Sequence, residues 1–158
     1  MYKIGVVGAG HLGKIHLKIL QNAPFVNLVG FFDSDPKVRE EIKSKFNIKS
    51  FDSYQELIDS SDIVDIVTPT LSHFNCAKEA LKSNKHVFIE KPVTHTVEEV
   101  KKLIKLAKIS GRKVQVGHVE RFNPAFAEAQ KLINQPRFIE VHRLAEFNSR
   151  GTDVSVIH

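Results

Sequence analysis

The sequence has one cysteine, one methionine and no tryptophan among its 158 residues. Cys76 has no second cysteine to pair with, so no internal disulfide forms and a reducing compartment is expected. No apolar run approaches the roughly 20 residues that a membrane span requires. The N-terminal MYKIGVV lacks the basic region and long apolar core of a signal peptide. We therefore expect a cytoplasmic protein with no membrane partner.

Basic residues outnumber acidic ones, with 23 Lys and Arg against 18 Asp and Glu and a formal charge of +5. Such a balance suits a nucleic acid or an anionic small molecule. The densest basic stretch, residues 101–108 (KKLIKLAK), falls on a helical pattern whose predicted buried stripe is Val97, Val100, Ile104 and Ala107. No aromatic side chains are interleaved with these lysines, so a solvated helix face is the better interpretation. We expect no nucleic-acid partner.

Strand-like apolar runs alternate with helical patterns, which is the mark of βαβ units and a parallel sheet. The runs are continuous, as expected for strands buried on both faces. They are residues 3–7 (KIGVV), 26–32 (VNLVGFF), 63–68 (IVDIVT), 86–90 (HVFIE) and 113–117 (KVQVG), and residues 48–51 (IKSF) predict a further short strand. The sequence therefore predicts an α/β fold with a Rossmann-type, doubly wound parallel sheet.

Helix boundaries carry local signals. Asp35 and Asn123 each stand before a proline, which is the pattern of an N-cap followed by proline at the first helical position. Residues 53–56 and 96–99 each begin with Ser or Thr and end with Glu, which predicts a capping box. Gly111 stands where the helix that starts near residue 96 is expected to end.

A glycine motif follows the first predicted strand. Gly8, Gly10 and Gly13 form G-x-G-x-x-G, with Gly8 for the tight turn, Gly10 for approach of a pyrophosphate and Gly13 for close helix–sheet packing. The N-terminus of the following helix offers free N–H donors and partial positive charge to the phosphates. The apolar side of that helix is predicted to be Leu12, Ile15 and Ile19. The motif predicts a dinucleotide site, the alternative being a turn that is rich in glycine for structural reasons alone.

An acidic residue at the end of the second strand completes the pattern. Asp33 stands about 20 residues after Gly13, where a carboxylate binds the ribose hydroxyls. Asp35 competes for this role, but its position before a proline explains it as an N-cap. A carboxylate at residue 33 repels a 2′-phosphate, so NAD is favoured over NADP. Lys37 and Arg39 are close enough in sequence to keep NADP as an alternative.

The C-terminal part of the chain breaks the alternation. Residues 137–158 open with a strand candidate, RFIEVHRLAEF, which has neither a following helix nor a partner strand. We interpret them as the start of an α+β substrate domain that this chain lacks. Residues 1–122 are then the NAD(P)-binding domain, and residues 123–136 a connecting helix with Phe126, Ala129 and Ile133 facing inward.

Three segments follow predicted strands at their carboxyl ends: TPTLSH after Val67, EKP after Ile89 and GHVERFNP after Val116. Ligands of open parallel sheets bind beyond these ends. Pro92 restricts Lys91 to an extended conformation and aims its ammonium over the site. From these residues alone, a surface lysine at the end of a loop is an equally good interpretation of Lys91.

The motifs GVVGAGHLGKIH, TPTLSHF, FIEKPVT and GHVERFNPAF, in this order, resemble the glucose–fructose oxidoreductase/inositol dehydrogenase (Gfo/Idh/MocA) family. The resemblance covers nearly the whole chain, and E-K-P is its most specific part. GHVERFNP and RGTDVSV further resemble the branch that acts on UDP-N-acetyl sugars. The family implies a C-terminal substrate domain with a large open sheet, reversible hydride transfer between a sugar-like alcohol and NAD(P), and a homo-oligomer (dimer or tetramer).

The resemblance also implies site residues by position. Those expected to bind the cofactor, from its adenine-dinucleotide half to its nicotinamide end, are Gly8, Gly10, His11, Leu12, Gly13, Asp33, Thr68, Pro69, Thr70, His73, Glu90, Lys91, Gly117 and His118. An ordinary exposed or capping histidine is the alternative for His73. Arg121 contacts the substrate or anchors its turn, and the sequence leaves both open. No metal site is expected.

Lys91 is the expected catalytic residue. A cation beside the reacting hydroxyl stabilises the developing alkoxide, and a lysine of lowered pKa can relay the proton. The resemblance also allows a cis Lys91–Pro92 peptide bond. The family's other catalytic residues, an aspartate and a histidine on a substrate-domain helix, lie beyond this chain. The chain is therefore predicted to be a cofactor-binding portion with an incomplete active site.

Two other classes of protein compete with this interpretation. A non-catalytic NAD(H)-sensing module would bind the cofactor without turnover, and its usual DNA-binding segment is not found. A methyltransferase with a glycine-rich first turn would bind S-adenosylmethionine, but it does not account for the glycine triplet and E-K-P together.

Overall fold

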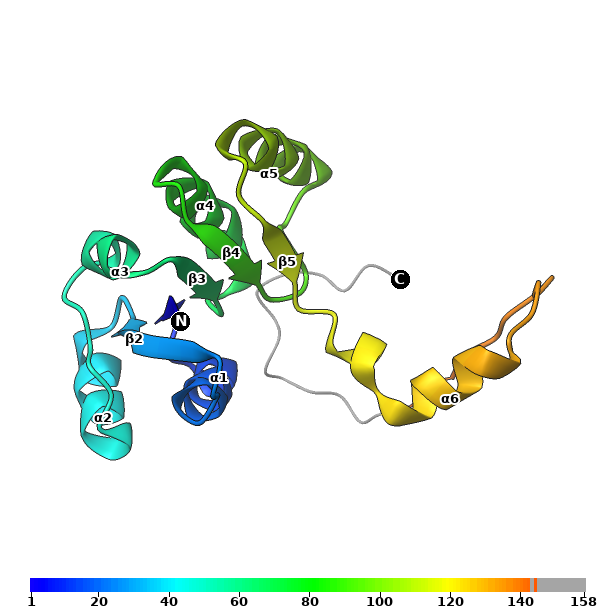
Figure 1. The fold of residues 1–158 in the computed structure, drawn as a ribbon, viewed down its shortest axis with the longest axis horizontal. Helices are drawn as coiled ribbons and strands as arrows, with labels where there is room; N and C mark the ends of the chain where they lie inside the picture. The colour runs from blue at the N-terminus through cyan, green and yellow to red at the C-terminus, as the bar shows by residue number, and fades with distance from the viewer. Residues whose placement is uncertain (143, 145–158) are drawn as a thin grey trace. The chain divides into compact units, whose positions relative to one another are not determined.

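The computed structural model describes residues 1–142 and 144 of the chain. It divides into two compact units, Met1–Gly117 and His118–His158. The first unit is a parallel sheet with helices on both faces (Figure 1). The described part of the second unit contains one 3-10 helix and one α-helix. The boundary predicted at residue 122 remains a prediction.

Five parallel strands form the sheet, in the order β2-β1-β3-β4-β5. They are β1 (Tyr2–Val7), β2 (Val26–Phe32), β3 (Ile63–Ile66), β4 (His86–Ile89) and β5 (Val114–Val116). The chain winds outward from β1 to β2 and then crosses back to β3, on the other side of β1. The strand order thus reverses beside β1, and in open α/β sheets ligands bind at this switch point. The predicted Rossmann-type fold is confirmed.

Helices cover both faces of the sheet and enclose two apolar cores. They are α1 (His11–Gln21), α2 (Pro36–Phe46), α3 (Tyr54–Ser60), α4 (Thr70–Lys82) and α5 (Val97–Ser110). Leu17 of α1 and Ile42 of α2 pack with Phe31 in one core. Leu57 of α3 and Leu81 of α4 belong to the other core, which also takes in α5. Figure 1 shows α4 and α5 on one side of the sheet and α1 and α2 on the other.

The short strand predicted for residues 48–51 does not form. Only an isolated parallel bridge pairs Phe31 with Ser50. Ile48 packs into the core beneath α1 and α2, whereas Phe51 packs into the core on the other face. The Phe31 N–H donates to the Lys49 carbonyl (3.0 Å) and the Phe51 N–H donates to the Phe31 carbonyl (2.8 Å), so the segment runs beside β2 but pairs with it through this one bridge.

The predicted helix caps are largely confirmed. The Asp35 carboxylate accepts a hydrogen bond from the Lys37 N–H (2.8 Å) at the start of α2. Thr96 and Glu99 form a complete capping box at α5, and Gly111 ends that helix in the left-handed conformation with φ 66°. At α3 only half of the predicted box forms, because the Glu56 carboxylate accepts from the Asp52 N–H instead of returning to the N-cap.

The buried faces of two helices differ from the predicted stripes. Leu103 is the buried residue of α5, whereas the side chains of Val97 and Ile104 are largely exposed. In α1 the buried residues are Gly13 and Leu17, and the predicted stripe of Leu12, Ile15 and Ile19 is exposed. One residue along a helix turns it by about 100°, so a shift of one position moves a stripe off the sheet.

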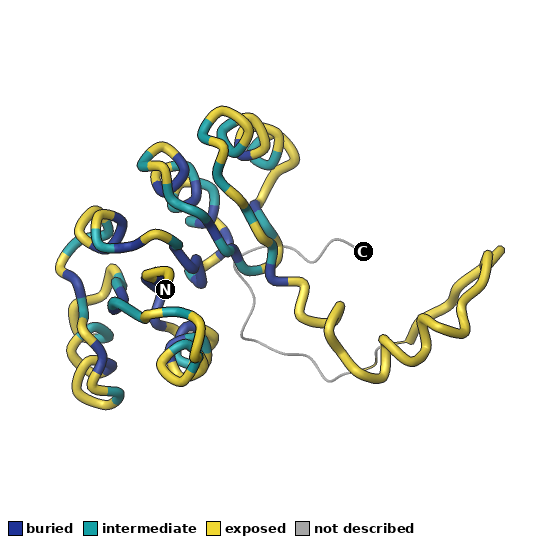
Figure 2. The backbone as a smooth tube through the Cα atoms, viewed as in Figure 1, coloured by how far each residue is buried: buried dark blue, intermediate teal, exposed yellow. Residues whose placement is uncertain are grey.

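The second unit contains η1 (Val119–Phe122) and α6 (Pro124–Leu132). The Asn123 side chain caps α6 by accepting from the Ala125 N–H (3.0 Å), as predicted. Phe126, Ala129 and Ile133 are exposed and do not face inward in the structure, and Figure 2 shows this unit exposed along its described length. Residues 137–142 form no strand, and the remainder of the predicted strand extends beyond the described residues.

Candidate active site

The glycine turn lies between β1 and α1. Gly8 has φ +95°, and a Cβ there would lie 2.7 Å from the Thr68 nitrogen, so no other residue fits. A Cβ at Gly13 would collide with the carbonyl oxygen of Gly8. A Cβ at Gly10 would meet no atom within 4 Å. Two of the glycines thus shape the turn, while the third faces open space in which a ligand can approach the backbone.

The N-terminus of α1 is suited to an anion. Gly10 is its N-cap, with no side-chain cap and no acidic residue in the first turn. His11 and Leu12 are exposed at the start of the helix. The first N–H groups of a helix have no partner within it and carry partial positive charge. This end of α1 therefore fits the pyrophosphate of a dinucleotide.

Asp33 lies beside this turn. Its carboxylate accepts hydrogen bonds from the Ala9 N–H (2.7 Å) and the Asp35 N–H (3.0 Å). A carboxylate has about four acceptor positions, so both oxygens remain able to accept from ribose hydroxyls. The Arg39 guanidinium donates to the backbone carbonyl of Asp33 (2.8 Å) and lies 5.7 Å from the ring centroid of Phe32. Asp33 thus braces the turn, and Asp35 caps α2 as predicted.

His73 joins two loops at the ends of neighbouring strands. It lies in the first turns of α4, which begins at Thr70 after Pro69, and it is fully buried. Its Nε2 lies 2.8 Å from the carbonyl oxygen of Thr68, and its Nδ1 lies 2.9 Å from that of Pro92. It is neither an exposed nor a capping histidine. It holds the segment after β3 against the segment after β4.

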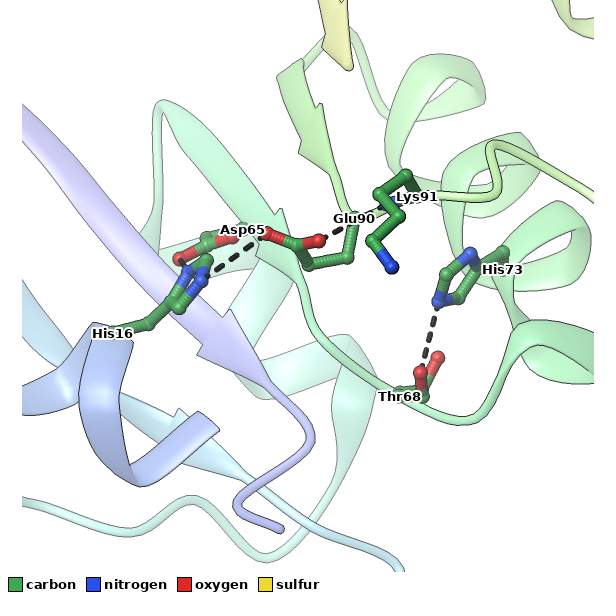
Figure 3. A network of polar contacts seen from close by, with 6 residues as sticks. All are labelled: His16, Asp65, Thr68, His73, Glu90 and Lys91. Atoms are coloured by element: carbon green, nitrogen blue, oxygen red, sulfur yellow. Dashed lines mark hydrogen bonds and ion pairs between the residues drawn. The ribbon is translucent and has the colours of Figure 1, made fainter. Parts of the chain in front are cut away.

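The Glu90-Lys91-Pro92 segment follows β4 directly. The Lys91–Pro92 peptide bond is cis. Figure 3 shows the Lys91 side chain extending into the space between Glu90 on one side and Thr68 and His73 on the other. Lys91 is exposed, and its ammonium takes part in none of the ion pairs found among the described residues. A free cation at this edge of the sheet is available to a ligand.

A polar network behind this segment was not predicted. The His16 Nδ1 on α1 lies 2.8 Å from the Asp65 carboxylate on β3, and its Nε2 lies 3.4 Å from the Glu90 carboxylate (Figure 3). One sequence signal could have revealed it, namely the charged Asp65 inside the apolar run IVDIV. A buried carboxylate in such a strand requires a partner, but its identity depends on how α1 lies across the sheet.

Both members of the buried pair have shifted pKa values. The hydrogen bond to Asp65 raises the pKa of His16 above its ordinary value, while burial opposes that rise. Burial raises the pKa of Asp65, and the hydrogen bond to His16 opposes that rise. The nearby carboxylate of Glu90 also favours the protonated imidazole. The two carboxylates thus favour the protonated form of His16.

The remaining predicted residues lie as follows. Gly117 follows β5, and a Cβ there would lie 2.7 Å from the Glu90 carboxylate. His118 is the first residue of the second unit, and Arg121 is exposed in η1.

Burial raises the pKa of Cys76 to about 11, so this thiol stays protonated and unreactive at neutral pH. No group of three metal-ligating side chains is found within residues 1–142, nor is any helix there long and apolar enough to cross a membrane.

The raised pKa of His16 makes stability depend on pH. The stabilisation is present in full below the ordinary value of 6.5 and is lost as the pH rises through the raised pKa. Asn at position 16 does not titrate, so we expect the unfolding free energies of the wild type and His16→Asn to converge as the pH rises. Urea unfolding below pH 6.5 and in mildly alkaline buffer checks this. The control His95→Asn, at an exposed position, should show no such convergence. If the difference in unfolding free energy between the wild type and His16→Asn did not change with pH, the His16–Asp65 pair would not be the source of the pH dependence.

Comparison with known proteins agrees with this geometry. Residues 2–118 match the model of an oxidoreductase family with an NAD-binding Rossmann fold. The UDP-N-acetylglucosamine 3-dehydrogenase of Acidithiobacillus ferrooxidans is 35% identical over 156 residues, which is 98% of this chain and 49% of that protein. The scyllo-inositol 2-dehydrogenase (NAD(+)) of Bacillus subtilis is 35% identical over 136 residues, which is 84% of this chain and 40% of that protein.

Solved structures show the same relationship. The solved structure of UDP-N-acetylglucosamine 3-dehydrogenase GnnA from Acidithiobacillus ferrooxidans aligns with this chain with a TM-score of 0.76 and 33% sequence identity. The alignment covers 83% of this chain and 43% of the GnnA chain. The chain thus spans about half, or less, of the length of these relatives. The match of residues 2–118 to the family model, together with 35% identity over 98% of the chain, shows that the chain belongs to the Gfo/Idh/MocA family of oxidoreductases.

Proposed function

We propose that this chain is the cofactor-binding part of an NAD-dependent oxidoreductase that acts on a sugar or cyclitol hydroxyl. The observation that carries the proposal is the open space at Gly10 beside an α1 N-terminus without a side-chain cap. A turn that was rich in glycine only for packing would have no need of a glycine there. The N–H groups of His11, Leu12 and Gly13 would hold the pyrophosphate, and Asp33 the adenosine ribose.

The nicotinamide end would lie at the carboxyl ends of β3 and β4. Thr68, Pro69 and Thr70 would line the cofactor's path on one side, with Glu90 and Lys91 on the other. His73 would support this wall from behind, because both of its ring nitrogens are engaged with backbone carbonyls. Gly117 leaves room for the Glu90 side chain.

Lys91 would handle the proton of the reaction. Bound NAD⁺ supplies the hydride acceptor. As the C–H hydride leaves the carbinol carbon, the C–O bond becomes a carbonyl and the hydroxyl proton must depart. The neutral Lys91 amine would accept the hydroxyl proton, and the ammonium so formed would stabilise the negative charge developing on the oxygen before it passes the proton to solvent. The exposed side chain at the end of β4 is placed for both roles.

The substrate class follows from the relatives, whose names specify a UDP-N-acetyl sugar and an inositol. We favour a UDP-N-acetylhexosamine, because the relative with that substrate matches 98% of this chain and the net charge of +5 suits an anionic nucleotide sugar. Further expectations are a homo-oligomer (dimer or tetramer) and a reducing cytoplasmic setting, the latter in keeping with a single cysteine. The methyltransferase alternative loses its basis, because the family is one of NAD-binding oxidoreductases.

Gly10→Ala tests the pyrophosphate site. A methyl group at this position meets no protein atom, so the free energy of unfolding should stay within about 1 kcal/mol of the wild type. The same methyl group occupies the space of the ligand, so NADH affinity should fall roughly tenfold or more by calorimetry. Gly13→Ala is the contrasting variant and should lose stability as well, since its Cβ collides with Gly8. Undiminished NADH binding by a folded Gly10→Ala would refute the assignment.

Asp33→Asn tests the preference for NAD. The Asn side chain can still accept from the Ala9 N–H, so the turn is kept while the negative charge is removed. NADH should bind the wild type more tightly than NADPH does, and the ratio of the two dissociation constants should move toward one in Asp33→Asn. Asp35→Asn is the matched control, because it lies at the cap of α2 and should leave the ratio unchanged. An equal response of both variants would point away from Asp33.

Lys91→Ala tests the catalytic role in the full-length protein. It should leave NADH affinity within a few-fold, because the pyrophosphate and ribose contacts lie elsewhere. It should lower kcat by roughly 10²–10⁴, the usual scale for a positioned proton-transfer group. Lys91→Arg should not restore the rate, since a guanidinium does not deprotonate. A near-normal rate in Lys91→Ala, matching that of the exposed control Lys101→Ala, would favour a non-catalytic NAD(H)-sensing module.

A further inference from the structure

Among the hydrogen bonds and ion pairs found in residues 1–142, the His16–Glu90 pair is the one that connects the helix of the glycine turn to the segment carrying Lys91. His16 projects from the second turn of α1 toward β3 and the end of β4 (Figure 3). One ring nitrogen meets Asp65 at 2.8 Å and the other meets Glu90 at 3.4 Å. None of the functions assigned above uses this residue.

Asp65 is a fixed anchor for the ring. It lies within β3 opposite Val6 of β1 and Phe88 of β4, so strands on both sides hold its backbone. The residue is 2% exposed, and its Oδ1 has no partner among the described residues. The bond from His16 to Oδ2 is thus the principal compensation for this buried carboxylate. The His16 ring also lies 6.1 Å from the ring of Phe88, so its orientation is restricted.

Glu90 is held from three sides. Its Oε1 faces His16 and its Oε2 accepts from the Lys91 N–H (3.1 Å). Gly117 supplies the third side, because any Cβ there would press on the carboxylate. The Glu90 side chain is only 14% exposed although Glu90 follows directly after the carboxyl end of β4. His16 is thus one of the groups that restrict the conformation of Glu90.

We propose that His16 is a positioning residue, which orders Glu90 and the adjoining Lys91 backbone so that the nicotinamide end of the site is preformed. This inference rests on the proposed function. His16 touches neither the glycine turn nor Asp33 through any hydrogen bond or ion pair found in residues 1–142. Its loss should therefore weaken recognition of the nicotinamide half and spare the adenosine and pyrophosphate half.

The protonation of His16 controls this ordering. The doubly protonated ring donates to both carboxylates at once. When one proton is lost, the remaining N–H serves Asp65, and a nitrogen lone pair then faces Glu90. The other titratable groups lining the same side of the sheet are Tyr2, His86 and Lys113. None of these forms an ion pair with His16 in the described part of the chain.

Two amide variants separate the two bonds of the ring. The amide nitrogen of Asn at position 16 can take the place of Nδ1 and preserve the bond to Asp65, but it is too short to reach Glu90. The amide of Gln can take the place of Nε2 and reach Glu90. His16→Asn thus keeps a hydrogen bond to the buried carboxylate while it removes the imidazole charge and the contact with Glu90, whereas His16→Gln, equally uncharged, is the variant expected to restore the Glu90 contact in part.

The experiment compares the binding of NADH with that of ADP-ribose, which lacks the nicotinamide, to the 158-residue chain by calorimetry. In the wild type NADH should bind more tightly than ADP-ribose. The quantity compared is the dissociation constant of ADP-ribose divided by that of NADH. In His16→Asn this ratio should fall toward one while the affinity for ADP-ribose stays unchanged. In His16→Gln the ratio should lie between that of His16→Asn and that of the wild type. The wild-type ratio should also decline as the pH rises, whereas the ratio of either variant should not.

A matched control is Tyr54→Phe, which removes a buried hydrogen bond to the Cys76 carbonyl and should leave the ratio unchanged. Equal losses of NADH and ADP-ribose affinity in His16→Asn would show a merely structural role and overturn the proposal. An unchanged ratio would overturn it as well, while leaving the proposed function intact. Failure of the wild type to bind either ligand would overturn the proposed function and this inference with it.

Discussion

The close approach of the glycine turn to the end of β3 is the constraint on which the rest of the site depends. Gly8 lies against the Val67–Thr68 peptide, and Gly13 lies against the carbonyl of Gly8, at distances that exclude a side chain. Because β1 and β3 are parallel neighbours, this packing brings the N-terminus of α1 to the edge where β3 and β4 end. The site is therefore a consequence of backbone packing at the switch point of the sheet.

Two histidines then tie the strand ends together. His73 bonds to carbonyls of the segments after β3 and β4, and His16 bridges carboxylates on β3 and after β4. Both links are made by short, rigid imidazole side chains. The ring of His73 is fully buried and that of His16 is largely buried. Lys91 differs, because its side chain is exposed and extends between Glu90 and His73 (Figure 3). A rigid frame around one free cation suits a site in which the position of a proton-transfer group decides the rate.

The acidic residues of the site have different roles, which their hydrogen-bond partners and burial determine. Within residues 1–142 the Asp33 carboxylate accepts from two backbone N–H groups, so it keeps acceptor capacity for a ribose. Asp35, two residues later, is occupied as a helix cap. Asp65 is buried, and its role is internal to the protein. The family membership of residues 2–118 agrees with this division, since it is the NAD-binding part of the relatives that the chain matches.

The sequence by itself determined the parallel sheet, the glycine turn, Asp33, the caps at Asp35 and Thr96, and the segment that carries Lys91. These features depend on local chemistry: hydrophobic runs, backbone freedom at glycine, and side chains that bond within a few residues of themselves. Only the tertiary structure decided that His16 lies between Asp65 and Glu90, that Leu103 is the buried residue of α5, and that residues 48–51 pair with β2 through a single bridge. Those outcomes depend on the rotation and tilt of each helix against the sheet, which arise from the packing of residues far apart in the chain.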